Sequence, residues 1–104
     1  MIEKANNDNL TQEYKNWILK AVAYHFPEAK VILFGSRARG TNRPGSDVDL
    51  AIDTGSPIQL SEMARTRVTL ENLPLALEFD IVDMHNIPEE LKEIIAREGV
   101  VWKN

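Results

Sequence analysis

The chain has no cysteine among its 104 residues, which excludes disulfide bonds, zinc–thiolate sites and thiol nucleophiles. It also lacks an apolar run long enough to cross a bilayer, and residues 1–9 are too polar for a signal peptide. These absences predict a cytoplasmic protein with no membrane partner. Hydrophobic residues make up 43% of the chain, enough for one packed domain over residues 1–104, of which 1–9 are expected to be flexible.

A generally basic composition is absent as well. Twelve Lys and Arg face sixteen Asp and Glu, so the formal net charge is -4. Proteins that bind nucleic acid need a basic face to displace counterions from phosphates, and direct binding to nucleic acid is therefore not expected. The exception to the acidic balance is local, because Arg37, Arg39 and Arg43 lie within one short segment.

The hydrophobic pattern alternates between strand and helix periods. Four strands are predicted, at residues 29–34, 47–53, 77–83 and 100–102. Three helices and one short helical turn are predicted, over residues 10–26, 58–72 (or 61–72), 89–98 and 37–40. Only a loop joins the first two strands, so they are expected to be antiparallel neighbours. This order predicts a single α/β or α+β domain with a small mixed or antiparallel sheet flanked by helices.

Particular side chains mark the limits and faces of these helices. Asn9 or Thr11 is placed to cap the first helix, and Trp17 belongs to its predicted core-facing stripe. Pro88 suits the first position of the last helix. The apolar positions of the middle helix are Leu60, Ala64, Val68 and Leu73.

Two aspartates stand two residues apart on the second predicted strand. Side chains alternate across a sheet, so Asp47 and Asp49 project to one side while Val48 and Leu50 project to the other. Carboxylates on a rigid strand suit Mg²⁺, which takes the rest of its shell from waters and phosphate oxygens. This pair therefore predicts a magnesium site.

A third carboxylate is available on the next predicted strand. Phe79 and Ile81 point one way there, and Asp80 points the other, whereas Asp83 has the parity of the apolar pair. Asp80 is therefore the residue that could complete a two-metal site, in which one ion activates the attacking oxygen and the other steadies the triphosphate.

A possible phosphate-binding segment precedes the aspartates. Gly35 lets the backbone approach a phosphate closely, and Ser36 offers a hydroxyl and an N–H group at the start of a helical turn. Arg37 and Arg39 could neutralise charge on a departing pyrophosphate. Each feature alone is common in turns, but their joint spacing indicates a site for a nucleoside triphosphate carried on magnesium.

The segment from Phe34 to Leu50 resembles the signature of the DNA polymerase beta superfamily of nucleotidyltransferases, and more narrowly the minimal nucleotidyltransferases of bacteria and archaea. Their pattern is Gly-Ser, ten residues, then Asp-x-Asp, which here reads Gly35-Ser36 followed by Asp47-Val48-Asp49. A hydrophobic-Asp-hydrophobic triplet on a later strand supplies the third carboxylate, and Phe79-Asp80-Ile81 matches it.

The resemblance implies a nucleotidyltransferase fold and an activity. Asp47, Asp49 and Asp80 would be the catalytic, metal-binding carboxylates for two Mg²⁺ ions, with ATP as the nucleotide donor. Gly35 and Ser36 would contact the nucleotide. In this family the usual partner is a HEPN-domain protein, and the nucleotidyltransferase often acts as an antitoxin that adds AMP to a tyrosine of the HEPN toxin.

Two other functions stay open at this stage. The chain could be a non-catalytic antitoxin that neutralises its partner by occlusion, or a small-molecule transferase of the aminoglycoside-modifying type. The intact carboxylate set disfavours the first, and the absence of an acceptor-binding segment disfavours the second. The residues do not select ATP over other nucleotides. They also leave homo- or hetero-oligomers open, with residues 100–102 as an edge that could pair.

Overall fold

The computed structural model describes residues 8–104, so most of the segment expected to be flexible lies outside the described residues. Four helices and four strands alternate along the chain, as the hydrophobic pattern predicts. The helices are α1 (Gln12–His25), α2 (Ser36–Arg39), α3 (Leu60–Glu71) and α4 (Glu89–Glu98). The strands are β1 (Lys30–Phe34), β2 (Val48–Asp53), β3 (Phe79–Asp83) and β4 (Val100–Lys103).

The strands form one mixed sheet in the order β3-β2-β1-β4. β1 is antiparallel to both β2 and β4, whereas β2 and β3 are parallel and are connected through α3. The expected antiparallel pairing of the first two strands is therefore confirmed. A parallel pair needs a long crossover, and α3 with its flanking loops provides it.

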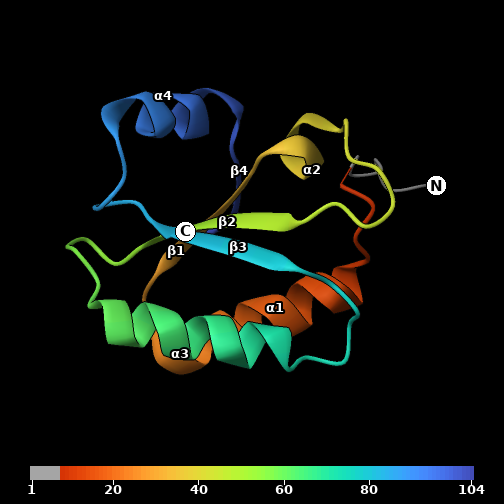
Figure 1. Ribbon diagram of the computed structural model, residues 1–104, viewed down its shortest axis with the longest axis horizontal. Coiled ribbons are helices and arrows are strands. Elements are labelled where there is room, and N and C mark those ends of the chain that lie inside the picture. The colour runs from red at the N-terminus through yellow and green to blue at the C-terminus, as the bar shows by residue number, and fades with distance from the viewer. Residues whose placement is uncertain (1–7) are drawn as a thin grey trace.

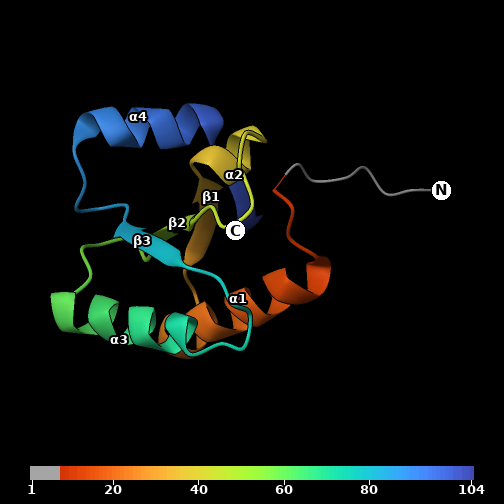
Figure 2. The ribbon, with the colours of Figure 1, turned by 45° about the vertical axis from the view of Figure 1, so that its right-hand side comes forward.

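Helices cover both faces of the sheet. In Figures 1 and 2, α1 and α3 lie on one face, while α4 and the short α2 lie on the other. The alternation of side chains explains this arrangement, since Leu50 and Ile52 pack in the cluster beneath α1 and α3, whereas Ala51 packs with Ile95 of α4. Within residues 8–104, no helix is both long enough and apolar enough to span a bilayer.

Helix α1 begins directly after Thr11, one of the two predicted caps, and ends one residue before the predicted limit at residue 26. Thr11 is its N-cap, and the Thr11 hydroxyl oxygen accepts a hydrogen bond of 3.1 Å from the backbone N–H of Tyr14. Pro88, by contrast, is the N-cap of α4 and not its first residue, because its ψ of 152° is extended. Its fixed φ suits either position, so the sequence alone did not separate the two.

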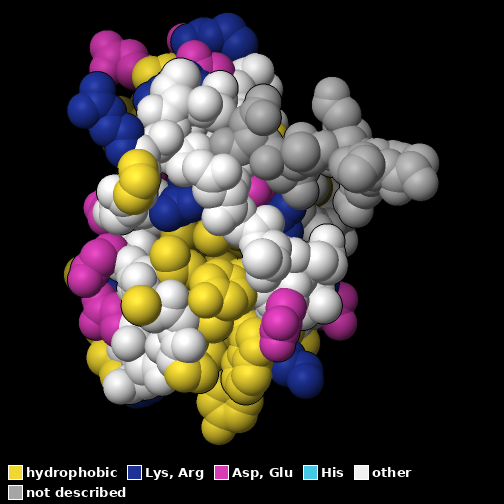
Figure 3. All heavy atoms as spheres, turned by 90° about the vertical axis from the view of Figure 1, so that its right-hand side faces the viewer, with side chains coloured by type: hydrophobic (Ala, Val, Ile, Leu, Met, Phe, Trp, Pro, Cys, Tyr) yellow, Lys and Arg dark blue, Asp and Glu magenta, His cyan; other side chains and the backbone are white. Residues whose placement is uncertain are grey.

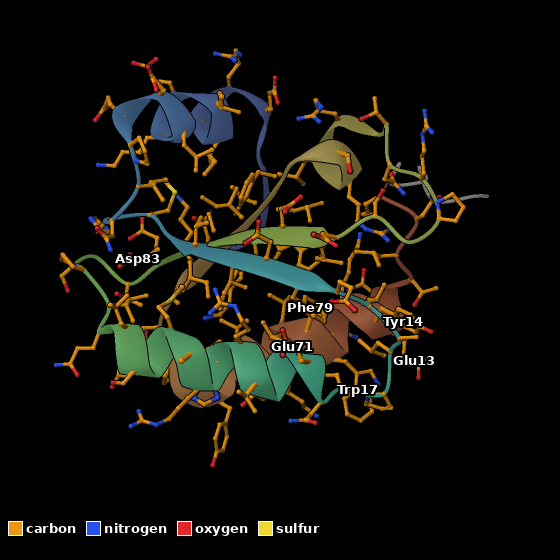
Figure 4. The ribbon with its side chains drawn as sticks, viewed as in Figure 1. Glu13, Tyr14, Trp17, Glu71, Phe79 and Asp83 are labelled. Carbon is orange, nitrogen blue, oxygen red and sulfur yellow. The ribbon has the colours of Figure 1, made fainter. Side chains whose placement is uncertain are left out.

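Two predictions about buried helix faces are wrong. Trp17 is 43% exposed, because the buried stripe of α1 runs through Ile18, Ala21 and Val22. Figure 4 shows Trp17 on the outer side of α1, and hydrophobic side chains gather on the lower part of the surface in Figure 3.

Helix α3 also presents a different face to the core. Leu60 and Val68 are largely exposed, while Met63, Thr66 and Leu70 are buried. Thr66 can occupy the buried row because its hydroxyl donates a 2.8 Å hydrogen bond to the carbonyl oxygen of Glu62. Helix α3 therefore carries two partly apolar rows, and packing against α1 and the sheet selects the row that contains the threonine.

Candidate active site

Asp49 and Asp80 occupy paired positions on the parallel strands β2 and β3. Paired residues in adjacent strands project to the same face of the sheet. On this face, Ala51 is buried and Val82 partly buried beneath the hydrophobic residues of α4, whereas Asp49 is half-buried and Asp80 is exposed. The two carboxylates therefore lie on the part of the sheet face that α4 leaves open.

Asp47 joins this pair from the segment just before β2. The strand begins at Val48, one residue later than predicted, so Asp47 lies outside it and is exposed. Its charge nevertheless acts on Asp49 and raises the pKa of that carboxyl. The three aspartates of the sequence motif thus lie in one region of the molecule.

The pKa of Asp49 is raised to about 6, mainly because burial removes water from its carboxylate, and further because Asp80 and Asp47 repel the negative charge. Arg39 and Arg37 act in the opposite direction and lower it. Carboxylates held together in this way bind a cation favourably, because the cation relieves both the repulsion and the lost hydration.

The carboxylate oxygens can bind a magnesium ion only if waters and phosphate oxygens supply the rest of its coordination shell. Among residues 8–104, no three His, Cys, Asp or Glu side chains converge closely enough to hold a metal unaided. Mg²⁺ commonly uses one or two carboxylates and completes its octahedron with waters and substrate phosphates. The arrangement therefore suits a metal that arrives with a triphosphate.

Gly35 lies directly beside the Asp49 side chain. It follows Phe34, the β1 partner of Asp49, and its φ of +78° is in the left-handed region that glycine tolerates. A Cβ atom here would collide with Oδ2 of Asp49 and lie 2.9 Å from its Cγ. Gly35 is therefore required to make room for a carboxylate, a reason that the sequence did not reveal.

Arg37 and Arg39 lie in different surroundings although they are two residues apart on α2. The Arg37 side chain is buried, and its guanidinium donates to the carbonyl oxygens of Asp8 and Ser46. The guanidinium of Arg37 is thus engaged by backbone carbonyl oxygens, and its contact with a phosphate stays a prediction. The Arg39 side chain is 46% exposed and forms a 3.3 Å ion pair with Glu98 at the end of α4.

Sequence reasoning missed the residues that hold Arg37 in place. Asp8 is buried, although it belongs to the segment expected to be flexible, and its Oδ2 lies 3.1 Å from Nζ of Lys15. Asp8 lies before α1 begins, so helical spacing could not have paired it with Lys15.

Residues 18–103 match the polymerase beta nucleotidyltransferase family. A curated relative from Haemophilus influenzae, named "Probable protein adenylyltransferase MntA", is 32% identical over 75 residues. The match covers 72% of this chain and 66% of that relative, so the chain spans slightly less than two thirds of the relative's length.

Solved structures share the same fold. A chain of a toxin–antitoxin complex with AMP-PNP aligns with a TM-score of 0.76 at 24% identity, covering 86% of this chain and 73% of that one. A chain of the complex between the tri-AMPylated HEPN toxin of Shewanella oneidensis and its MNT antitoxin aligns with a TM-score of 0.72 at 21% identity, covering 91% and 74%. These likenesses confirm the predicted fold, and the family match covers both the Gly-Ser segment and the three aspartates. The chain belongs to the polymerase beta nucleotidyltransferase family.

Proposed function

We propose that this protein transfers AMP from ATP, with Mg²⁺, to a tyrosine hydroxyl of a HEPN-domain partner, and that it acts in this way as an antitoxin. The observation that carries the proposal is the pairing of Asp49 with Asp80 across β2 and β3, with Gly35 leaving space beside the Asp49 carboxylate. A protein that neutralised its partner by occlusion alone would have no physical need for this arrangement.

Each carboxylate has a distinct place in the proposed reaction. Bound Mg²⁺ supplies Lewis-acid stabilisation of the triphosphate and lowers the pKa of a coordinated hydroxyl. Asp47 and Asp49 would hold the metal–triphosphate, and Asp49 is the least exposed of the three carboxylates. Asp80 is exposed, and the resemblance to the superfamily makes it the carboxylate that would lie nearest an incoming acceptor.

The transfer balances as a displacement at the α-phosphorus of ATP. The tyrosine oxygen forms a bond to that phosphorus, the bond from the α-phosphorus to the bridging oxygen breaks, and pyrophosphate leaves with the bridging oxygen. The hydroxyl proton passes to the Asp80 carboxylate and then to water. The charge of Arg39 acts on Asp49, and its side chain can exchange the ion pair with Glu98 for a contact to the departing pyrophosphate.

The names of related proteins support a HEPN-domain protein as the acceptor and ATP as the donor of AMP. The Haemophilus relative carries the name of a protein adenylyltransferase, the Shewanella complex contains an AMPylated HEPN toxin, and another complex contains the ATP analogue AMP-PNP. The same function agrees with a cytoplasmic location, where ATP and Mg²⁺ are available.

The direct test uses a HEPN-domain protein as the acceptor, to be sought in the reading frame next to that of this chain. Purified chain, partner, Mg²⁺ and ATP labelled on the α-phosphate are expected to give a partner that carries AMP on tyrosine, located by mass spectrometry of its peptides. Removal of Mg²⁺ with EDTA is expected to stop labelling. A partner that is silenced without any covalent AMP would contradict the proposal and support a non-catalytic antitoxin.

A further inference from the structure

Buried charged side chains form one connected group at the start of the chain. In the part of the chain that the structure describes, the buried charged residues are Asp8, Lys15, Arg37 and Asp83, and Asp8 contacts both Lys15 and Arg37. Burying a charge is costly unless it is paired and hydrogen-bonded, so three such residues in contact indicate a specific requirement at this place.

Arg37 is the centre of this group, and its side chain joins two distant segments. Its Nη1 donates a 2.6 Å hydrogen bond to the carbonyl oxygen of Asp8, just before α1. Its Nε and Nη2 both donate to the carbonyl oxygen of Ser46, at 3.2 and 2.9 Å. Ser46 is the residue immediately before Asp47, so the guanidinium fixes the backbone from which that carboxylate projects.

Asp8 is itself fixed in position and can therefore serve as an anchor. Its Oδ2 is paired with Lys15 at 3.1 Å, and its Oδ1 accepts a 2.9 Å hydrogen bond from the backbone N–H of Leu10. Nζ of Lys15 also lies 5.7 Å from the ring centroid of Trp102 in β4. The anchor is thus connected to α1 and to the edge of the sheet.

Among residues 8–104, the segment that carries Asp47 makes few other hydrogen bonds to the rest of the domain. A turn over residues 43–46 closes on itself, since Ser46 N donates to Arg43 O at 2.9 Å and Arg43 N donates to the Ser46 hydroxyl at 2.8 Å. These bonds shape the turn but do not place it against the domain. The next attachment is the 2.9 Å bond from Val48 N to Glu78 O, already at the start of β2.

We propose that Arg37 is a positioning residue for Asp47, and that the Asp8–Lys15 pair holds Arg37 in place. The proposal rests on the metal-dependent function described above for the importance of Asp47, but the connection itself is independent of that function. The three residues act through the backbone of Ser46.

The first test measures amide hydrogen exchange in the metal-free protein. Loss of charged hydrogen bonds to Ser46 is expected to speed exchange at the hydrogen-bonded amides of Ser46 and Val48, on either side of Asp47, by about tenfold or more in Arg37→Lys, with exchange in α3 unchanged. Arg43→Lys is the matched control, because Arg43 lies in the same segment with an exposed side chain, and it is expected to leave those rates unchanged.

A second variant tests the anchor without leaving a buried charge unpaired. The double variant Asp8→Ala/Lys15→Met removes both charges together, and it is expected to speed exchange at the same two amides. If Arg37→Lys behaves like Arg43→Lys, Arg37 does not position Asp47. If Arg37→Lys loosens the segment and the double variant does not, the part of the proposal that assigns an anchor is overturned.

The final readout is binding of Mn²⁺ in the presence of a non-hydrolysable ATP analogue. Arg37→Lys is expected to raise the Mn²⁺ concentration for half-saturation by about tenfold, and Arg43→Lys to leave it unchanged. If the wild-type protein binds no Mn²⁺, the proposed function fails while hydrogen exchange still decides the positioning role. If wild type and Arg37→Lys bind Mn²⁺ equally, the positioning role fails by itself.

Discussion

Asp49 and Asp80 lie opposite each other on the parallel strands β2 and β3, and the pKa of Asp49 is raised to about 6. Burial is the larger cause, and repulsion by Asp80 and Asp47 adds to it. At neutral pH the charged Asp49 carboxylate therefore destabilises the folded protein, and a bound cation would relieve this destabilisation.

Asp49→Asn is expected to stabilise the metal-free protein at pH 7.5 by about 1 kcal/mol, after allowance for solvent screening. The folded state binds the Asp49 proton more tightly than the unfolded state does, so the stability that Asp49 contributes is present at acid pH and lost as the pH rises through about 6. Urea unfolding at pH 4 and pH 7.5 checks this, and the stabilisation should be small at pH 4.

Asp53→Asn is a control for which the opposite change in stability is expected. Burial would raise the pKa of Asp53, but hydrogen bonds from Gly55 and His85 outweigh it and lower the pKa. The stability from Asp53 is present above its ordinary pKa and lost as the pH falls, so this substitution should destabilise at pH 7.5. If Asp49→Asn and Asp53→Asn changed the free energy of unfolding equally at pH 7.5, the surroundings of Asp49 would not disfavour its charged carboxylate.

Metal binding is expected to weaken as the pH falls below about 6. A cation must displace the proton from Asp49, so the affinity for Mn²⁺ with a non-hydrolysable ATP analogue should fall by about tenfold per pH unit in that range. Removing the repulsion with Asp80→Asn should move this decline to lower pH. Calorimetric titrations from pH 5 to pH 8 measure both, and a flat affinity would contradict the assignment of Asp49 as a ligand.

Gly35→Ala is expected to lose metal–nucleotide binding and to cost about 2 kcal/mol of stability, because the new Cβ collides with Asp49 and φ is +78°. Gly45→Ala is the matched control, since Gly45 has φ +87° with nothing within 4 Å of its Cβ position. Thermal unfolding of both proteins separates the collision from the backbone strain. Equal losses in the two proteins would mean that the contact with Asp49 contributes nothing.

The buried face of α3 predicts a contrast between two neighbouring apolar residues. Leu70 is fully buried, so Leu70→Ala should cost about 2–5 kcal/mol, whereas Val68 is 56% exposed and Val68→Ala should change stability by less than about 0.5 kcal/mol. Urea unfolding measures both. A larger loss from Val68→Ala than from Leu70→Ala would contradict the observed orientation of α3.

Side-chain parity predicted the placement of the two aspartates of β3 from sequence, because strand alternation is a strict two-residue rule. It placed Asp80 on the open face and Asp83 among the buried residues, and the structure has both there. In Figure 4, Phe79 and Asp83 lie at opposite ends of β3. The Asp83 carboxylate is satisfied in the core by the backbone N–H of Ile58 at 2.7 Å.

Helix faces were less predictable because tertiary contacts decide between competing apolar rows. Trp17 stands beside Ile18 on α1, and only the position of the sheet determines which of them is buried. The contacts of Arg37 were unpredictable for a related reason, since its acceptors are backbone carbonyls of residues 8 and 46, and carbonyls carry no sequence signal. The sequence predicted the candidate site residues, whereas the contacts that support them required the fold.

The most direct measurement compares transfer of labelled AMP to the HEPN partner by the wild-type protein, Asp49→Asn and Asp53→Asn. The carboxylate site predicts rapid labelling by wild type and by Asp53→Asn, and a loss on the order of 10²-fold or more in Asp49→Asn. Labelling by Asp49→Asn at the wild-type rate, or no labelling by the folded wild-type protein with Mg²⁺ and ATP, would contradict it.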